Sequence, residues 1–116
     1  LLKGILKDFP DYKMQLHVRL SDLIGNLNGF NNYEINYITH PKTHVDFVIF
    51  DKITKKPVLC IEVDGVKYHD YSIKQLIHDE IKTKVLALNG LALLKLRTNQ
   101  SNEAVKIISE LRNNRI

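Results

Sequence analysis

Three acidic residues that lie close together in the sequence are the best candidates for chemistry. Asp46 opens the apolar run 47–50, and Glu62 and Asp64 close a second apolar run, 58–63. Because side chains on a strand alternate between its two faces, Glu62 and Asp64 share one face. If the two runs are neighbouring strands, the three carboxylates meet at one edge of a sheet. Such a set of oxygen ligands suits a divalent ion such as Mg²⁺ or Mn²⁺.

Two of these acids also have a plainer interpretation. The dipeptide Asp64-Gly65 is a strong signal for a hairpin turn. Asp46 could be a carboxylate at the edge of a strand, paired with a lysine or an arginine. The joint occurrence of these acids with the downstream pattern described below favours the metal interpretation.

The elements that would position these residues follow from the spacing of apolar side chains. Alternation predicts strands, and a spacing of three to four residues predicts helices. The expected elements are a helix over 1–9, a strand over 12–20, a helical turn over 21–27, strands over 33–37, 45–50 and 58–64, a helix over 73–88, a strand over 91–96 and a last helix after Ser101. This is an α/β (α+β) fold with a mixed central sheet flanked by helices, in the order α-β-β-β-β-α-β-α.

The expected helix over 73–88 carries the clearest start signal, a Ser-x-x-Gln capping box at Ser72 and Gln75. One apolar stripe should face inward, made of Ile73, Leu76, Ile77, Ile81, Val85 and Leu88. His78, Asp79 and Lys82 would lie on the opposite face. The strand over 91–96 should return parallel to a central strand through a right-handed crossover.

The chain of 116 residues has the size of one domain, 1–116. No apolar stretch is long enough to span a bilayer, and lysines interrupt the first ten residues, so neither a membrane span nor a signal peptide is expected. A lone Cys60 in an apolar run predicts a buried thiol in a reducing compartment, and hence a cytoplasmic protein. Because the chain starts at Leu1, without Met and within a helical pattern, we expect a fragment of a longer polypeptide.

The net charge of +4 comes entirely from the C-terminal part of the chain. Residues 1–73 hold nine basic and nine acidic residues, whereas residues 74–116 hold eight basic and four acidic residues. A basic part beside an acidic cluster fits a polyanion held near a metal site. A solvated helix surface explains the same surplus equally well.

Taken together, these residues resemble the PD-(D/E)XK nuclease superfamily, which has the restriction-endonuclease-like fold. The closer resemblance is to a branch with an aspartate opening one strand, Ile-Glu-x-Asp-Gly closing the next, a histidine soon after, an Asp-x-x-Lys helix and a Gly-x-x-Leu-Leu strand. These motifs stand here at 44–47, 61–69, 79–82 and 90–97, and 18–24 is similar to the first strand of that branch. Relatives in the branch include domains similar to the very-short-patch repair endonuclease and modules at the C-termini of bacterial superfamily I helicases.

The resemblance covers nearly the whole chain, with two departures. The superfamily signature has a lysine two residues after the glutamate, where this chain has Asp64. The branch shares that change, so the resemblance implies that another residue supplies the cation, and Lys82 is the candidate. A solvated helix lysine is the alternative for Lys82. An N-terminal helical glutamate, common in relatives, is absent from 1–9.

Other candidate roles fall outside the acidic cluster, and the resemblance implies the one for His69. His69 is a candidate general acid or base, with a solvated loop histidine as the alternative. Candidate phosphate contacts, which would position a backbone without reading its sequence, are Lys67, Lys95 and Arg97. Glu80 and Lys84 are expected to form a surface pair. No metal-ligand spacing or role is assigned to His17, His40 and His44.

We therefore expect a metal-dependent DNA endonuclease-like domain that hydrolyses phosphodiester bonds. A divalent ion would polarise the phosphate and lower the pKa of the attacking water. Its ligands would be Asp46, Glu62 and Asp64, assisted by Lys82 and His69. The expected partners are DNA and a helicase region of the same parent chain, with no membrane. Two alternatives stay open: a non-catalytic nucleic-acid-binding module that keeps the nuclease fold, and a domain that docks a helicase to protein partners.

Overall fold

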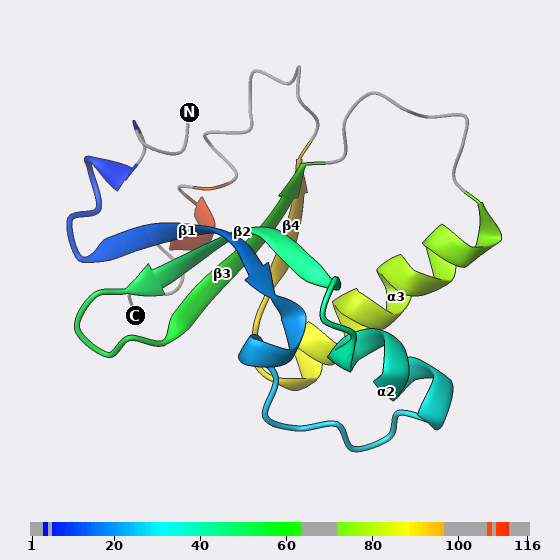
Figure 1. Cartoon of the computed structure of the whole chain (residues 1–116). Helices are drawn as coiled ribbons and strands as arrows, with labels where there is room; N and C mark the ends of the chain where they lie inside the picture. Colours follow the sequence, from blue (N-terminus) through cyan, green and yellow to red (C-terminus); the bar gives the residue numbers. More distant parts are fainter. Residues whose placement is uncertain (1–3, 5, 64–71, 97–106, 108, 112–116) are drawn as a thin grey trace.

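The computed structural model describes residues 4, 6–63, 72–96, 107 and 109–111. Within these residues the elements with defined bounds (Figure 1) are β1 Tyr12–Arg19, the 3₁₀ turn η1 Leu20–Leu23, α2 Asn32–Thr39, β2 His44–Asp51, β3 Pro57–Val63, α3 Ile73–Leu88 and β4 Leu93–Leu96. Residues 4 and 6 near the N-terminus, and 107 and 109–111 near the C-terminus, are also helical.

The four strands form one mixed sheet in the order β1-β2-β3-β4. The pairs β1–β2 and β2–β3 are antiparallel, whereas β4 lies parallel to β3 after the chain has passed through α3. The predictions that 58–64 is an inner strand and that 91–96 returns parallel to it are thus confirmed for the residues described. The mixed sheet with helices is confirmed at this level of detail.

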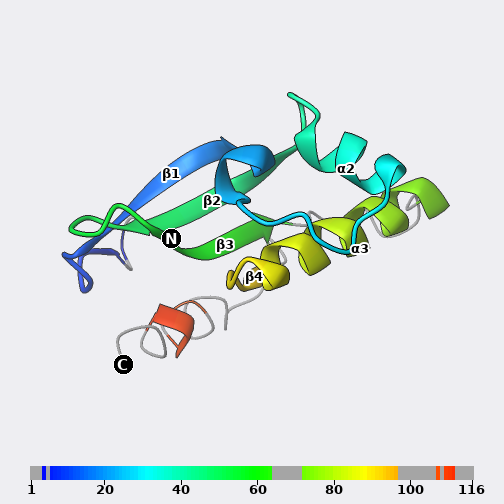
Figure 2. The ribbon, with the colours of Figure 1, turned by 90° about the horizontal axis from the view of Figure 1, so that it is seen from below.

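The inner strand β3 is buried on both faces, because its apolar side chains alternate between two core clusters. Cys60 packs with Val48 and with Ile81 of α3 in one cluster. Leu59 and Ile61 belong to the other cluster, which also contains residues of β2, β4 and the parts of the chain near its two ends: Phe9, Tyr12, Ile49, Leu96, Ile107 and Leu111. Figures 1 and 2 show α2 and α3 side by side against the first of these faces.

The expected strand over 33–37 is wrong, because these residues belong to the helix α2. The reason is a capping box that the alternation of apolar residues concealed. The Asn31 side chain accepts a hydrogen bond of 2.8 Å from the Glu34 backbone, and the Glu34 side chain accepts one of 2.9 Å from the Asn31 backbone. The described order is therefore β-α-β-β-α-β, with the 3₁₀ turn after β1, and the sheet has one strand fewer than expected.

The helical turn expected over 21–27 is shorter, since η1 spans only Leu20–Leu23 and has no side-chain cap. The following loop is held instead by Asn89, which caps the C-terminal end of α3. The Asn89 Oδ1 atom accepts hydrogen bonds of 2.9 Å from the backbone of Gly25 and of Asn26, and its Nδ2 donates one of 2.9 Å to the Asn26 carbonyl.

The helix α3 begins at the predicted Ser72–Gln75 capping box, but its predicted apolar stripe is only partly buried. Ile81 and Val85 lie in the core, as expected. The other four members of the stripe are exposed: Ile73, Leu76, Ile77 and Leu88. The first three lie in the first half of α3, which projects beyond the sheet in Figure 1.

Candidate functional site

The register of β2 and β3 brings two of the predicted acids together. These strands pair antiparallel with Phe47 opposite Ile61, and the same register continued by one residue places Asp46 opposite Glu62. Residues directly opposite each other point to the same face, with Cβ atoms about 4.5–5.5 Å apart. The two carboxylates thus lie side by side near the end of the β2–β3 pairing, on strands joined by a short hairpin.

A backbone hydrogen bond fixes the carboxylate of Asp46. Its Oδ2 atom accepts a hydrogen bond of 3.1 Å from the Val63 backbone N–H. Asp46 is half-buried, and the described hydrogen bonds leave its Oδ1 atom available to a ligand. Among the described residues, no lysine or arginine forms an ion pair with Asp46, so they do not support the alternative interpretation of this residue.

Lys82 of α3 lies beside Glu62. Its Nζ donates a hydrogen bond of 2.7 Å to Glu62 Oε2 and one of 3.0 Å to the backbone carbonyl of His44. Glu62 and Lys82 are both buried. The alternative interpretation of Lys82 as a solvated lysine is therefore wrong, and so is its placement on the face opposite Ile81, since both residues are buried against the sheet.

The electrostatics of Glu62 reflect this enclosed position. Burial raises the pKa of Glu62, Lys82 opposes that rise through its hydrogen bond and charge, and the negative charges of Asp46 and Asp79 increase it. The net effect is a pKa above the ordinary value of a glutamate. Lys82 bonds to Glu62 alone of the two carboxylates, so the pair carries a surplus of negative charge when both are ionised, and such a site attracts a cation.

Several other predicted site residues lie outside the described residues, so their roles stay predictions: Asp64, Lys67, His69 and Arg97. Lys95 is described, on β4, and its Nζ lies 3.3 Å from Asp79 Oδ2. Its charge is thus already shared with an acid of α3. The predicted surface pair is confirmed, with 2.7 Å between Lys84 Nζ and Glu80 Oε1.

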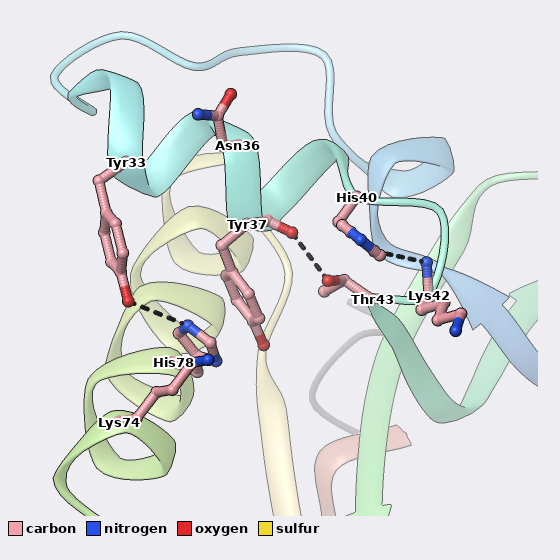
Figure 3. Close-up of a pocket in the computed structure, with 8 residues that line it drawn as sticks. All are labelled: Tyr33, Asn36, Tyr37, His40, Lys42, Thr43, Lys74 and His78. Atoms are coloured by element: carbon pink, nitrogen blue, oxygen red, sulfur yellow. Dashed lines mark hydrogen bonds between the residues drawn. The ribbon is translucent and has the colours of Figure 1, made fainter.

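A pocket of about 410 Å³ lies between α2, α3 and the turn before β2 (Figure 3). Aromatic and basic side chains predominate among the described residues of its lining, none of which is acidic: Tyr33, Asn36, Tyr37, His40, Lys42, Thr43, Lys74 and His78. The Tyr37 and His78 rings stack, with centroids 4.0 Å apart and planes inclined by 18°. The Tyr33 hydroxyl is hydrogen-bonded to His78 Nε2 at 3.2 Å.

This pocket adjoins the carboxylate pair through Tyr37. Burial raises the pKa of Tyr37 to about 12, and the negative charges of Glu62 and Asp79 contribute to the rise. Burial, together with the positive charges of Lys74 and Lys82, lowers the pKa of His78. Tyr37 and His78 are therefore uncharged at neutral pH, and their stacked rings offer an aromatic surface next to the lysines.

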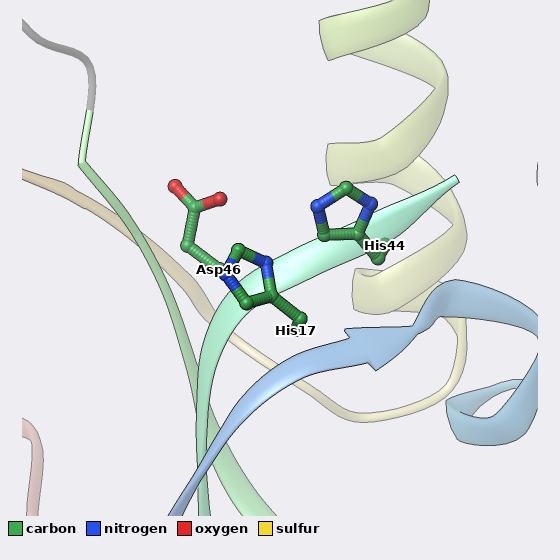
Figure 4. Close-up of side chains that lie close together, drawn as sticks. All are labelled: His17, His44 and Asp46. Atoms are coloured by element: carbon green, nitrogen blue, oxygen red, sulfur yellow. The ribbon is translucent and has the colours of Figure 1, made fainter. Parts of the chain in front are cut away.

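Two histidines without a predicted role lie next to Asp46. His17 and His44 have ring centroids 5.1 Å apart, and Figure 4 shows both rings gathered near the Asp46 carboxylate. His44 and Asp46 are two residues apart on one strand, and this spacing in the sequence indicates that their side chains share a face. His17 joins them only through the pairing of β1 with β2, and spacing along the chain could not reveal that pairing.

The fold and these side chains define an α+β domain whose inner strands and covering helix bring two carboxylates and a lysine together. Residues 1–114 match the model of a family described as a protein of unknown function, DUF2726, and the chain belongs to this family. No curated protein and no solved structure matches the chain significantly. Among the described residues, no helix is both long and apolar enough to cross a membrane.

Proposed function

We propose that this domain is a metal-dependent phosphodiester hydrolase that acts on DNA, with the restriction-endonuclease-like fold. The observation that carries the proposal is the placement of Asp46 and Glu62 on neighbouring strands, with the buried Lys82 ammonium 2.7 Å from Glu62. Two carboxylates and a lysine are the groups that this chemistry needs, and here the lysine comes from α3 rather than from β3.

The residues fit a magnesium or manganese ion. Mg²⁺ is commonly held by one or two carboxylates, retains several waters and takes further oxygens from substrate phosphates. Asp46 Oδ1 and Glu62 Oε1 are the oxygens that the described hydrogen bonds leave free. Such an ion would supply charge for the transition state and lower the pKa of the attacking water. Asp64 is the proposed third ligand.

Residues other than the carboxylates have separate roles in this proposal. Lys82 can donate to a phosphate oxygen, since the described contacts use two of its three hydrogens. His69 is the proposed proton-transfer group, and the proposed phosphate contacts are Lys67, Lys95 and Arg97. The pocket beside Tyr37 suits nucleic acid, because bases stack on aromatic rings and lysines attract the backbone. A helicase or repair protein is the proposed parent chain, and the cytoplasm the proposed location.

A second candidate is a non-catalytic nucleic-acid-binding module. The observation that favours it is the Glu62–Lys82 ion pair itself, because a carboxylate already compensated by an ammonium group needs a metal less. This candidate predicts DNA binding that weakens with salt and does not depend on Mg²⁺. A protein-docking module is favoured instead by the exposed side chains at the start of α3: Ile73, Leu76 and Ile77.

The proposal can be tested by calorimetric titration of Mg²⁺ and Mn²⁺, together with cleavage assays on single- and double-stranded DNA. Asp46→Asn and Glu62→Gln should each abolish metal-dependent cleavage. The matched control is Glu80→Gln, which changes an exposed carboxylate of α3 and should leave cleavage intact. Asp46→Asn is the cleaner variant, since it leaves the pair between Lys82 and Glu62 in place.

The outcomes separate the candidates. Equal residual cleavage in wild type and Asp46→Asn would assign the activity to a contaminant and reject the proposal. Salt-dependent DNA binding without any metal-dependent turnover would establish the binding module instead. Absence of DNA binding at low salt would leave the docking module.

A further inference from the structure

We propose that His17, His44 and Asp46 bind one divalent transition-metal ion of the zinc class. Each of the three side chains offers one ligand atom, and these atoms all lie within 4.8 Å of one another. The rings and the carboxylate come from two neighbouring strands, β1 and β2 (Figure 4). This inference does not depend on nuclease activity, although the proposed magnesium site shares Asp46.

The spacing of the ligand atoms is close to what a metal requires. Zinc–ligand bonds of about 2.0–2.1 Å place two ligand atoms of a tetrahedral site roughly 3.3 Å apart. Atoms that lie within 4.8 Å of one another need to approach by roughly 1.5 Å at most. His17 is exposed, so rotation about its side-chain bonds can bring its ring nitrogen closer to the other two ligand atoms without moving a strand.

A hydrogen bond selects the tautomer of His44 that a metal ligand needs. Its Nδ1 lies 2.8 Å from the backbone carbonyl oxygen of Lys42. A carbonyl oxygen can only accept, so Nδ1 carries the hydrogen, and the lone pair of the neutral ring is on Nε2. Metal-binding histidines in proteins typically make this second hydrogen bond, which fixes the ring and its tautomer.

The backbone at His17 is unusual in a way that points to the same site. His17 has a φ of 50° in the middle of β1, a left-handed conformation that non-glycine residues adopt uncommonly and at a cost in free energy. The register pairs Leu16 with Phe47 and Val18 with Val45, so His17 falls opposite Asp46. Strained backbone of this kind clusters at functional sites.

The ligand types select the ion, and the surroundings suggest what else binds. Imidazole favours zinc, cobalt, nickel and iron, whereas magnesium prefers oxygen ligands. Three protein ligands leave at least one coordination position open. A pocket of about 340 Å³ adjoins the two histidines and is lined, among the described residues, by His17, Arg19, Pro41 and His44. The guanidinium of Arg19 in this pocket suits an anion such as phosphate on the open position.

The first test is calorimetric titration of Zn²⁺ and Co²⁺ into the protein with Mg²⁺ present in excess, together with the absorption spectrum of the Co²⁺ form. We expect one ion per chain. His44→Ala and Asp46→Asn should each weaken binding on the order of 100-fold or more, because loss of a direct ligand exceeds the 10–100-fold effect of changing an outer partner. His40→Ala is the matched control and should bind as wild type.

His17→Gly separates metal binding from folding. Glycine adopts positive φ without strain, so the midpoint of urea unfolding without metal should be unchanged or raised, while Zn²⁺ and Co²⁺ binding is lost. Glu62→Gln should retain this binding and lose magnesium-dependent cleavage, so failure of one proposal does not imply failure of the other. The inference is overturned if wild type binds neither ion stoichiometrically, or if His17→Gly and His44→Ala bind as tightly as wild type.

Discussion

The two faces of α3 carry ion pairs of equal length in opposite surroundings. The distance is 2.7 Å from Lys82 to Glu62 on the inner face, and 2.7 Å from Lys84 to Glu80 on the outer face. The inner side chains are 11% and 10% exposed, the outer ones 64% and 64%. Because water screens the outer charges and not the inner ones, equal geometry gives very unequal energies. Distance alone therefore does not identify the functional pair.

The largest expected effect comes from removing one partner of the inner pair. Lys82→Met keeps most of the side-chain volume but leaves the Glu62 carboxylate buried and unpaired, which should lower the free energy of unfolding by about 3–5 kcal/mol at pH 7. The matched variant Lys84→Met should unfold close to wild type. Urea denaturation of both proteins measures the contrast, and similar losses in the two would contradict it.

A smaller loss is expected when both inner charges are removed together. In Glu62→Gln/Lys82→Met no unpaired charge remains, and replacing a buried ion pair by uncharged residues is often nearly neutral. The double variant should therefore be more stable than Lys82→Met alone. A double-mutant cycle measures this coupling, and additive losses would show that the two residues act independently.

The penalty in Lys82→Met should also depend on pH. Burial already raises the pKa of Glu62 in the folded wild type, so the folded state holds this proton to a higher pH than the unfolded chain. Stability from the bound proton is present below the unfolded pKa and is lost as pH rises through the folded value. Without Lys82 that folded value rises further. The difference in the free energy of unfolding between wild type and variant should thus be smaller at pH 5 than at pH 7, as measured by urea denaturation at each pH. A difference in unfolding free energy that is larger at pH 5 than at pH 7 would refute this prediction.

The smallest effect is expected on the outer face. Glu80→Gln removes the partner of Lys84, but both side chains are exposed. The change in unfolding midpoint should be barely measurable at low salt and should vanish at high salt, because counterions screen exposed charges. A shift that persists in high salt would mean that this pair is less exposed in solution than the structure indicates.

Most strands could be predicted from the sequence, because the apolar pattern of these segments matches the pattern of burial in the sheet. The exception is 33–37, where Tyr33 and Tyr37 fit a period of two and a helical spacing of four equally well. The Asn31–Glu34 capping box decided the outcome in favour of a helix. Local hydrogen bonds at the helix start, rather than apolar periodicity, carried the missing information.

The candidate site was predictable where its residues come from consecutive strands. Asp46 and Glu62 meet because a short hairpin joins their strands, and Lys82 was a candidate through resemblance to a family. Burial of Lys82 could not be predicted, since the way in which α3 lies across the sheet, with its first half projecting beyond the sheet and three stripe members exposed there, is a tertiary feature. His17 was missed because the spacing of residues along the chain does not predict the pairing of β1 with β2.

The contacts of Asn89 have a consequence for the order in which the chain folds. They join the end of α3 to residues 63 and 64 positions earlier in the sequence. Closing so long a loop is entropically unfavourable until other contacts have brought its ends together. The hydrogen bonds of Asn89 to Gly25 and Asn26 should therefore form after the β2–β3 hairpin and α3 have packed together. Replacing Asn89 should then speed unfolding while leaving the rate of folding nearly unchanged.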